Sequence, residues 1–471
     1  MENKNFLNMK LKQRYFPFEY IITAWLALQL LPLYSLSSTT SIIILTLLMI
    51  TKYHLEAFRF NYFIYPLAQI VILLTSNIYF RCAAILFVII MIDLFPVYEY
   101  PEPTGKYKVG YKSIYQREHG EELNIAIFYP TMEQDLANRN KHFDSLMEVS
   151  KRNYYGFCLV VSRYFPPLLL LPKFFIDLAH TLFHRVFMNI TIDAQLISNP
   201  AKGDKFPVVV FSHGLGAFNH LLSLYLREWA SHGFIVFSVD HDEEIYLKWK
   251  KYSDFVNVRI PQLQVRKRQI KLALDYVYNP ENINHLFQRK VQLDYQKVFM
   301  AGHSFGSATS VTVAHEDSRI TAGLVLLDPW LDPCAENVFK KAIGKPIILI
   351  RSVQLDKMKP VREKVLKFVE VNKGMIFSGH YKDTTHNDVT DFMLTKPKNL
   401  KHLLRLSKKS DKTNREHQLI LHYSIVNKFL ERIADAPCKN NSPPEIVDEI
   451  RDFVQELLEK YGNDDDFIYD V

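Results

Sequence analysis

The chain has 471 residues, of which 48% are hydrophobic and 13% aromatic, so it can bury a large core and is not intrinsically disordered. Its net charge of +7 is mild, is spread along the sequence and accompanies no nucleic-acid motif, which excludes nucleic acid as an expected partner. The four cysteines are scattered without a CxxC pair, and we expect no disulfide framework, metal or cofactor.

Four apolar runs dominate the N-terminus, and each is near or below the ~20 residues that a bilayer crossing needs. Stretches such as Ile42–Ile50 have no polar face, which favours membrane helices over the alternative, a soluble helical domain. The sequence therefore predicts a transmembrane module of four helices over residues 1–97. The runs are Tyr20–Leu36, Ser41–Thr51, Tyr62–Ile78 and Cys82–Val97.

Basic residues flank these runs unevenly. The N-terminal arm and the loop at Lys52–Arg59 are basic, whereas the loop at Leu36–Ser41 has no charge. With four spans, the positive-inside rule places the N-terminus and the larger C-terminal part in the cytoplasm, and with three spans the C-terminal part changes sides. We expect a multi-pass integral membrane protein whose C-terminal domain is cytoplasmic.

A proline-rich stretch, Pro96–Thr104, predicts a stiff linker over residues 98–106. Beyond it, short apolar strands alternate with helices, which predicts βα units and a mostly parallel sheet over residues 107–471. The expected strands are Tyr107–Ile114, Leu123–Tyr129, Phe206–Ser212, Phe234–Val239, Lys297–Gly302, Thr321–Leu327, Lys345–Arg351 and Gly374–Phe377. The expected helices are Phe218–Ser231, Pro261–Tyr278 and Pro444–Tyr461.

One strongly apolar stretch, Phe165–Phe187, precedes most of these strands. It has two interpretations. It is either a lid or interfacial segment beside an active site, or a buried helix with a few hydrogen-bonded histidines. The sequence leaves both open.

The stretch Lys297–Thr309, KVFMAGHSFGSAT, carries the clearest chemistry. An apolar strand runs into Gly-His-Ser-Phe-Gly and then into small residues that begin a helix. This is the strand, turn and helix of a G-x-S-x-G nucleophile elbow, in which glycines permit a tight turn and the serine is exposed. Ser304 is the expected nucleophile.

A serine nucleophile needs a base, and the base needs an acid that orients it. Asp328 follows the expected strand Thr321–Leu327 and is the expected acid, ahead of Asp332, which lies beyond a proline. His386, on a loop after the last short strand, is the expected base, ahead of His380, which nearly abuts that strand.

The oxyanion formed by such chemistry needs two backbone N–H donors. We expect one from Phe305, directly after the nucleophile, and the other from Leu215 in the loop Ser212-His213-Gly214-Leu215-Gly216. His213 either braces this loop or caps the preceding strand. A strand, an H-G-x-G turn and a later G-x-S-x-G elbow together form a strong joint signal.

These motifs resemble the platelet-activating-factor acetylhydrolases of the plasma and type-II intracellular kind. The similar segments are PTGKYKVG (Pro103–Gly110), FSHGLGAF (Phe211–Phe218), ASHGFIV (Ala230–Val236), GHSFG (Gly302–Gly306), LDPW (Leu327–Trp330) and HNDVTDF (His386–Phe392). Two segments depart from the family pattern. Ser307 stands where many members have glycine, and Asp240–Glu243 replaces a basic stretch.

The resemblance implies an α/β-hydrolase fold and calcium-independent cleavage of the short or oxidised sn-2 acyl ester of a phospholipid. It also implies the triad Ser304, Asp328 and His386, with Leu215 and Phe305 as oxyanion donors. Two alternatives remain: a general carboxylesterase resembling dienelactone hydrolases, and an inactive hydrolase that serves as a membrane scaffold. Oligomeric state is not predicted.

Overall fold

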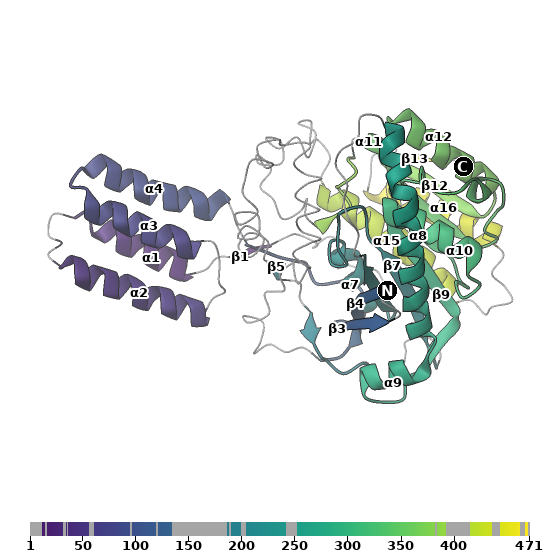
Figure 1. The fold of residues 1–471 in the computed structure, drawn as a ribbon, viewed down its shortest axis with the longest axis horizontal. Coiled ribbons are helices and arrows are strands. Elements are labelled where there is room, and N and C mark those ends of the chain that lie inside the picture. The colour runs from purple at the N-terminus through teal and green to yellow at the C-terminus, as the bar shows by residue number, and fades with distance from the viewer. Residues whose placement is uncertain are drawn as a thin grey trace.

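The computed structural model describes residues 12–14, 17–31, 34, 36–55, 61–94, 97–118, 121–133, 186–187, 190–198, 204–241, 252–381, 384–391, 415–435, 443–461 and 467–469. They form two regions (Figure 1). Four helices lie side by side at one end, and a larger α/β domain forms the other. The first region corresponds to the four apolar runs, and the second to the alternating strands and helices.

The four N-terminal helices pack around a small apolar core that includes Ile22, Tyr65 and Val88. Polar groups are buried with them. Lys52 Nζ lies 3.5 Å from a carboxylate oxygen of Glu19, and both side chains are almost fully buried. The side-chain amides of Gln29 and Gln69 exchange two hydrogen bonds of 2.8 Å, so each satisfies the other. The helices are α1 (Pro17–Leu28), α2 (Ser38–Leu55), α3 (Asn61–Leu74) and α4 (Ile78–Leu94).

The expectation of a multi-pass integral membrane protein is wrong. No helix within the described ranges is both long and apolar enough to cross a bilayer. The helices have 12, 18, 14 and 17 residues, short of the ~20 that a span requires. The cytoplasmic placement of the C-terminal domain rested on counting spans, and it falls with them.

The segment expected to be an irregular linker contains a short strand, β2 (Val97–Glu99). It pairs antiparallel with β1 (Lys12–Arg14) and parallel with β5 (Val186–Phe187). Prolines 101 and 103 follow and cannot donate to a ladder, so the strand ends there. All of Phe165–Phe187 except its last two residues lies outside the described residues, and its two interpretations stay open.

The α/β domain is built on a ten-stranded sheet with the order β13-β12-β11-β10-β9-β7-β8-β4-β3-β6. The six central strands from β12 to β8 are parallel, whereas β4 and β13 pair antiparallel at either side of them. The strands are β3 (Lys108–Glu118), β4 (Glu121–Thr131), β6 (Thr191–Ile192), β7 (Phe206–Ser212), β8 (Ile235–Asp240), β9 (Leu293–His303), β10 (Leu324–Leu327), β11 (Ile347–Ser352), β12 (Ile376–Tyr381) and β13 (Phe467–Tyr469).

Helices cover both faces of this sheet, so its central strands are apolar on both sides. Successive residues of β7 point to opposite faces. Val209 and Phe211 join a core with α7 (Ser223–Ser231), α15 (Arg415–Asp435) and α16 (Pro443–Tyr461). Val208 and Val210 join the other core, with α8 (Tyr252–Val277), α9 (Pro280–Phe287), α10 (Phe305–Glu316) and α12 (Lys359–Val371).

The predicted elements agree with the structure in type and differ at their ends. Strand β7 has the predicted bounds, and β3 and β4 form the predicted pair. Helix α8 begins nine residues before the predicted start at Pro261, which lies inside the helix. Helices α12 and α15 were not predicted. A mixed α/β fold with a largely parallel sheet is thus confirmed.

Candidate active site

Ser304 sits at the turn between β9 and α10, with a backbone φ of +56° that is rare for a non-glycine residue. The turn is held on both sides. Ser304 N–H donates to the carbonyl of Leu327, and the carbonyl of Ser304 accepts from Ser307 N–H and Trp330 N–H. The hydroxyl is thereby presented at the carboxyl end of the parallel strands, where ligands of such sheets bind.

The two glycines of the elbow leave no space for a side chain. A Cβ at Gly306 would lie 1.9 Å from the carbonyl oxygen of Ser212, and one at Gly302 would lie 2.4 Å from the Gly306 backbone. Ser307, the departure from the family pattern, is accommodated because its buried hydroxyl donates to the carbonyl of Gly302 at 2.8 Å. The elbow therefore tolerates serine at this position.

The structure brings Ser304, His386 and Asp328 together, although they are far apart in sequence. His386 Nδ1 lies 2.6 Å from Asp328 Oδ2, and His386 Nε2 lies 2.9 Å from Ser304 Oγ. A carboxylate only accepts, so Nδ1–H donates to Asp328, and Nε2 is left to accept the proton of the hydroxyl. This is the chain of contacts that a base-activated serine requires.

Asp328 is buried but held in its charged form. Burial alone would raise its pKa, but the nearby charge of His386 and hydrogen bonds from His386 and Ser352 outweigh this and lower it. Ser352 supplies two of these bonds, from its N–H at 2.7 Å and from its hydroxyl at 2.6 Å. Ser352, at the end of β11, was not identified from the sequence.

The rival residues have other partners. Asp332 lies near Tyr252, and burial raises its pKa. His380, at the end of β12, lies with Nδ1 3.4 Å from a guanidinium nitrogen of Arg351. The structure thus pairs Ser304 with His386 and Asp328, the residues preferred from their positions along the chain.

Four hydrogen bonds fix the loop that carries His386. The N–H of His386 donates to Gln354 Oε1 at 2.9 Å, and the N–H of Thr385 donates to Asp388 at 2.6 Å. Farther along, the buried carboxyl of Asp391 accepts from the Ser223 hydroxyl and from Leu224 N–H at the start of α7. The histidine is therefore held on a braced loop, which fixes its orientation.

His303 also contacts the base. Its ring stacks on that of His386, with centroids 4.8 Å apart, and its Nε2–H donates to the His386 carbonyl at 3.3 Å. Burial and the neighbouring His386 lower the pKa of His303 to about 3, so it stays neutral and adds no competing charge. Its place directly before the nucleophile was visible in the sequence, but its contact was not.

The expected oxyanion loop follows β7 and lies against the nucleophile. A Cβ at Gly214 would lie 3.3 Å from Ser304 Cβ and 3.0 Å from His303 Nδ1, so a larger residue there would crowd the nucleophile. His213 braces the loop. Its Nε2 accepts from the N–H of His241, and its Nδ1–H donates to the carbonyl of Gly214 at 2.8 Å. Leu215 follows directly, partly exposed at the site.

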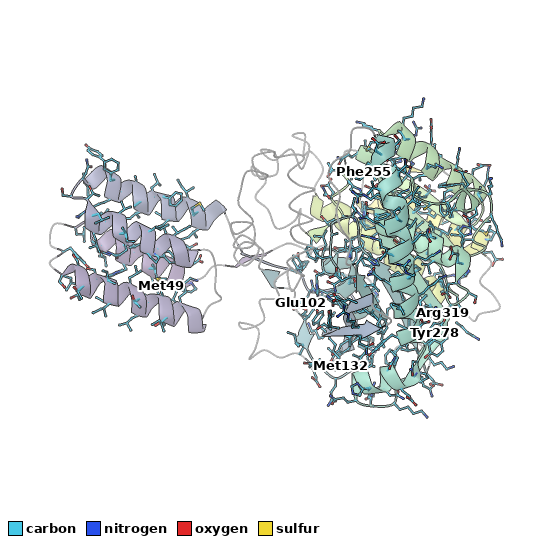
Figure 2. All side chains as sticks on the ribbon, in the orientation of Figure 1. Met49, Glu102, Met132, Phe255, Tyr278 and Arg319 are labelled. Carbon is cyan, nitrogen blue, oxygen red and sulfur yellow. The ribbon has the colours of Figure 1, made fainter. Side chains whose placement is uncertain are left out.

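An aromatic cluster adjoins the nucleophile. The ring of Trp330 lies 5.5 Å from that of Phe305 and 5.2 Å from that of Phe255, and its Nε1–H donates to Tyr252 at 2.7 Å. Phe255 is labelled in Figure 2, on the long helix α8. These rings form an aromatic wall beside the turn that carries Ser304. Within the described ranges, no three metal-binding side chains are grouped to hold an ion.

Comparisons with known proteins show which family the chain resembles. The family model "Platelet-activating factor acetylhydrolase, isoform II" matches residues 93–246 and 241–442. The platelet-activating factor acetylhydrolase of Cavia porcellus is 27% identical over 345 residues, which cover 66% of this chain and 73% of that protein. The one of Canis lupus familiaris is 28% identical over 54% of this chain and 60% of its own length.

A solved structure has a similar fold. A ferulic acid esterase from Streptomyces cinnamoneus aligns with a TM-score of 0.50 and 18% sequence identity, over 74% of this chain and 98% of its own. At this identity the likeness shows the fold alone.

Proposed function

We propose that the chain is a serine esterase of α/β-hydrolase fold that acts through Ser304, His386 and Asp328. It belongs to the platelet-activating factor acetylhydrolase family, isoform II, and is a carboxylic ester hydrolase. The observation that carries the proposal is the unbroken chain of contacts from Ser304 Oγ through His386 to Asp328. Such a chain turns a weakly nucleophilic hydroxyl into an effective one.

In the proposed reaction, Ser304 Oγ attacks the ester carbonyl carbon while its proton moves to His386 Nε2. The tetrahedral intermediate collapses, the bond to the alcohol oxygen breaks, and His386 returns the proton to that oxygen. Water then attacks the acyl-Ser304 ester in the same manner and releases the carboxylic acid. Asp328, which is ionised, stabilises the imidazolium formed in each half.

The negative charge on the carbonyl oxygen is received by the backbone N–H groups of Leu215 and Phe305 in this proposal. Phe305 opens α10, so its N–H has no partner within that helix and lies at its positive end. Leu215 follows Gly214, which packs against Ser304, on the loop after β7. No cofactor takes part in this scheme.

For the substrate, we propose the short or oxidised sn-2 acyl ester of a phospholipid. Family membership supports a phospholipid, and the aromatic wall of Trp330, Phe255 and Tyr252 supports an acyl group beside the nucleophile. The alternative is a general esterase for small esters. Asp240 and His241, in the stretch that departs from the family pattern, are buried, and they do not offer a headgroup contact.

A substrate panel tests this function. Purified wild type and Ser304→Ala are assayed on phosphatidylcholines with acetyl, butyryl, hexanoyl and palmitoyl groups at sn-2, and on p-nitrophenyl acetate. We expect kcat/KM to fall as the sn-2 chain lengthens and all turnover to be lost in Ser304→Ala. Turnover of p-nitrophenyl acetate without any phospholipid hydrolysis would favour the general esterase. No turnover of any of these esters would favour the inactive scaffold.

A further inference from the structure

One buried side chain contacts both segments that supply the proposed oxyanion donors. Arg266, on α8, is fully buried. Its Nη1–H donates to the carbonyl of His213 at 2.5 Å, and its Nη2–H donates to the carbonyl of Gly214 at 3.1 Å. The same guanidinium lies over the ring of Phe305, 4.5 Å from the centroid.

The carbonyl of Gly214 accepts from Arg266 and also from His213 Nδ1–H and Ala217 N–H, and together these donors fix the peptide that carries the N–H of Leu215. In a trans peptide, the carbonyl of one residue and the N–H of the following residue lie in one plane and point in opposite directions. Because the Gly214 carbonyl points to Arg266, the N–H of Leu215 points away from it. Gly214 itself packs against Ser304 and His303, so this peptide lies beside the nucleophile.

The second donor is held through its side chain. Phe305 is the first residue of α10, and its N–H emerges at the start of that helix. A guanidinium over an aromatic face is attractive, and more so where water is excluded. Arg266 therefore holds the ring of Phe305 while it holds the loop that carries Leu215, and the two donors share one fixed support.

We propose that Arg266 is a positioning residue that keeps the N–H groups of Leu215 and Phe305 aimed at the oxyanion. The inference rests on the proposed serine esterase function. Only arginine suits this role, because its planar fork reaches two neighbouring carbonyls at once and stacks on a ring, whereas lysine offers a single charged point. The guanidinium charge also polarises the Gly214 peptide, which makes the N–H of Leu215 a stronger donor.

The matched control is Arg227, the buried arginine of α7. Its Nη2–H donates to the backbone carbonyl of Pro101 at 3.0 Å, and its guanidinium lies 5.7 Å from the ring of Tyr100. It thus resembles Arg266 in burial, in its carbonyl acceptor and in its ring contact, but its hydrogen-bonded carbonyl and its ring belong to the linker region and not to the oxyanion loop. Loss of Arg227 is expected to affect stability and not turnover.

The experiment compares wild type, Arg266→Lys, Arg266→Met and Arg227→Lys. For each we measure thermal unfolding, kcat and KM on a short-chain sn-2 ester, and inhibition by a trifluoromethyl ketone, which forms a tetrahedral adduct with an oxyanion. We expect both Arg266 variants to lose kcat by about 10- to 100-fold, with KM nearly unchanged and trifluoromethyl ketone affinity lowered in parallel. Arg227→Lys should keep the wild-type kcat and inhibitor affinity while it lowers the unfolding temperature.

The outcomes separate this inference from the proposed function. A folded Arg266→Lys that keeps kcat and inhibitor affinity within twofold of the active wild type would overturn the role of Arg266 alone. Failure of both Arg266 variants to fold would make the residue purely structural and would equally overturn it. A wild type that turns over no ester would remove both proposals together.

Discussion

The N-terminal helices and the α/β domain differ in which side chains they bury and which they expose. In the α/β domain, large apolar side chains fill two cores on the faces of the sheet, and the few that are exposed are scattered. Helices α1–α4 have a much smaller apolar core, bury a Lys52–Glu19 pair, and expose many large apolar side chains, such as Ile43, Leu47 and Phe80. The side chains that project from both regions can be followed in Figure 2.

This difference assigns the chemistry to one region. The proposed triad, the oxyanion loop and Arg266 all belong to strand ends, loops and helices of the α/β domain, where dense packing fixes each side chain. The N-terminal helices contribute no side chain to the contacts described around Ser304. Changes to these groups should therefore lower activity, whereas changes in the N-terminal helices should affect stability and leave activity intact.

The largest effect is expected from Asp328→Asn. The asparagine cannot hold His386 in the tautomer that accepts from Ser304, so kcat should fall about 10⁴-fold. Steady-state kinetics on a short-chain sn-2 ester measure this, with Asp332→Asn as the matched control expected to retain activity. Equal loss in the two variants would contradict the assignment of the acid.

A substitution in the N-terminal helices should lower stability and leave kcat unchanged. Lys52→Met leaves the carboxylate of Glu19 buried without its cation, which should destabilise the helices by about 3–5 kcal/mol. The double variant Glu19→Leu/Lys52→Met should recover most of this, because no charge is then buried alone. Hydrogen exchange of residues 17–94 measures the loss, and kcat should not change. A tenfold fall in kcat would show that the two regions are coupled.

His232, in the α/β domain, should make the stability of that domain depend on pH. It lies between Glu228 and Glu431, at 3.1 and 2.8 Å, beside Asn427 and Thr104. Burial alone would lower its pKa, but hydrogen bonds to the two carboxylates and their charges raise the pKa to about 9.

The sign of this pH dependence follows from linkage. Below pH 6.5 His232 is protonated in the folded and unfolded states, and its contribution is fully present. As pH rises toward 9, only the folded state keeps the proton, so the contribution, on the order of 3 kcal/mol, is lost. Thermal unfolding at pH 6 and pH 9.5 should show a larger fall for wild type than for His232→Gln. Equal falls would refute the assignment.

The smallest effect is expected on the outer surface of the N-terminal helices. Ile43 and Leu47 are about half exposed on α2, at 53% and 57%. Changing both to glutamine should alter the free energy of unfolding by less than about 0.5 kcal/mol per site, because little packing is lost. Chemical denaturation measures the change. A loss above 2 kcal/mol would mean that these side chains are covered in the native protein.

Much of the α/β domain could be predicted because buried parallel strands are continuous apolar runs. Phe206–Ser212 and Lys297–Gly302 stood out in this way, and the elbow and Asp328 followed from their positions at strand ends. The choice of His386 over His380 came from loop position and family resemblance. Helix α8 was predicted too short, since Pro261 was taken as its start although the helix continues through it.

What could not be predicted depends on contacts between distant residues. The roles of Arg266, Ser352 and His303 arise from hydrogen bonds and stacking that link separate elements, and no local pattern marks them. The N-terminal error had a different cause. Apolar runs such as Tyr20–Leu36 were counted at full length, whereas the helix there ends at Leu28, and apolar composition alone does not reveal where a helix stops.

The most direct test of the account is to locate the reactive serine. Full-length protein is incubated with a fluorophosphonate and digested, and the labelled peptide is identified by mass spectrometry. We predict one adduct per chain, on Ser304, lost in Ser304→Ala and strongly slowed in Asp328→Asn. An adduct on another residue, or an unlabelled wild type, would contradict the proposal that Ser304, His386 and Asp328 carry out ester hydrolysis.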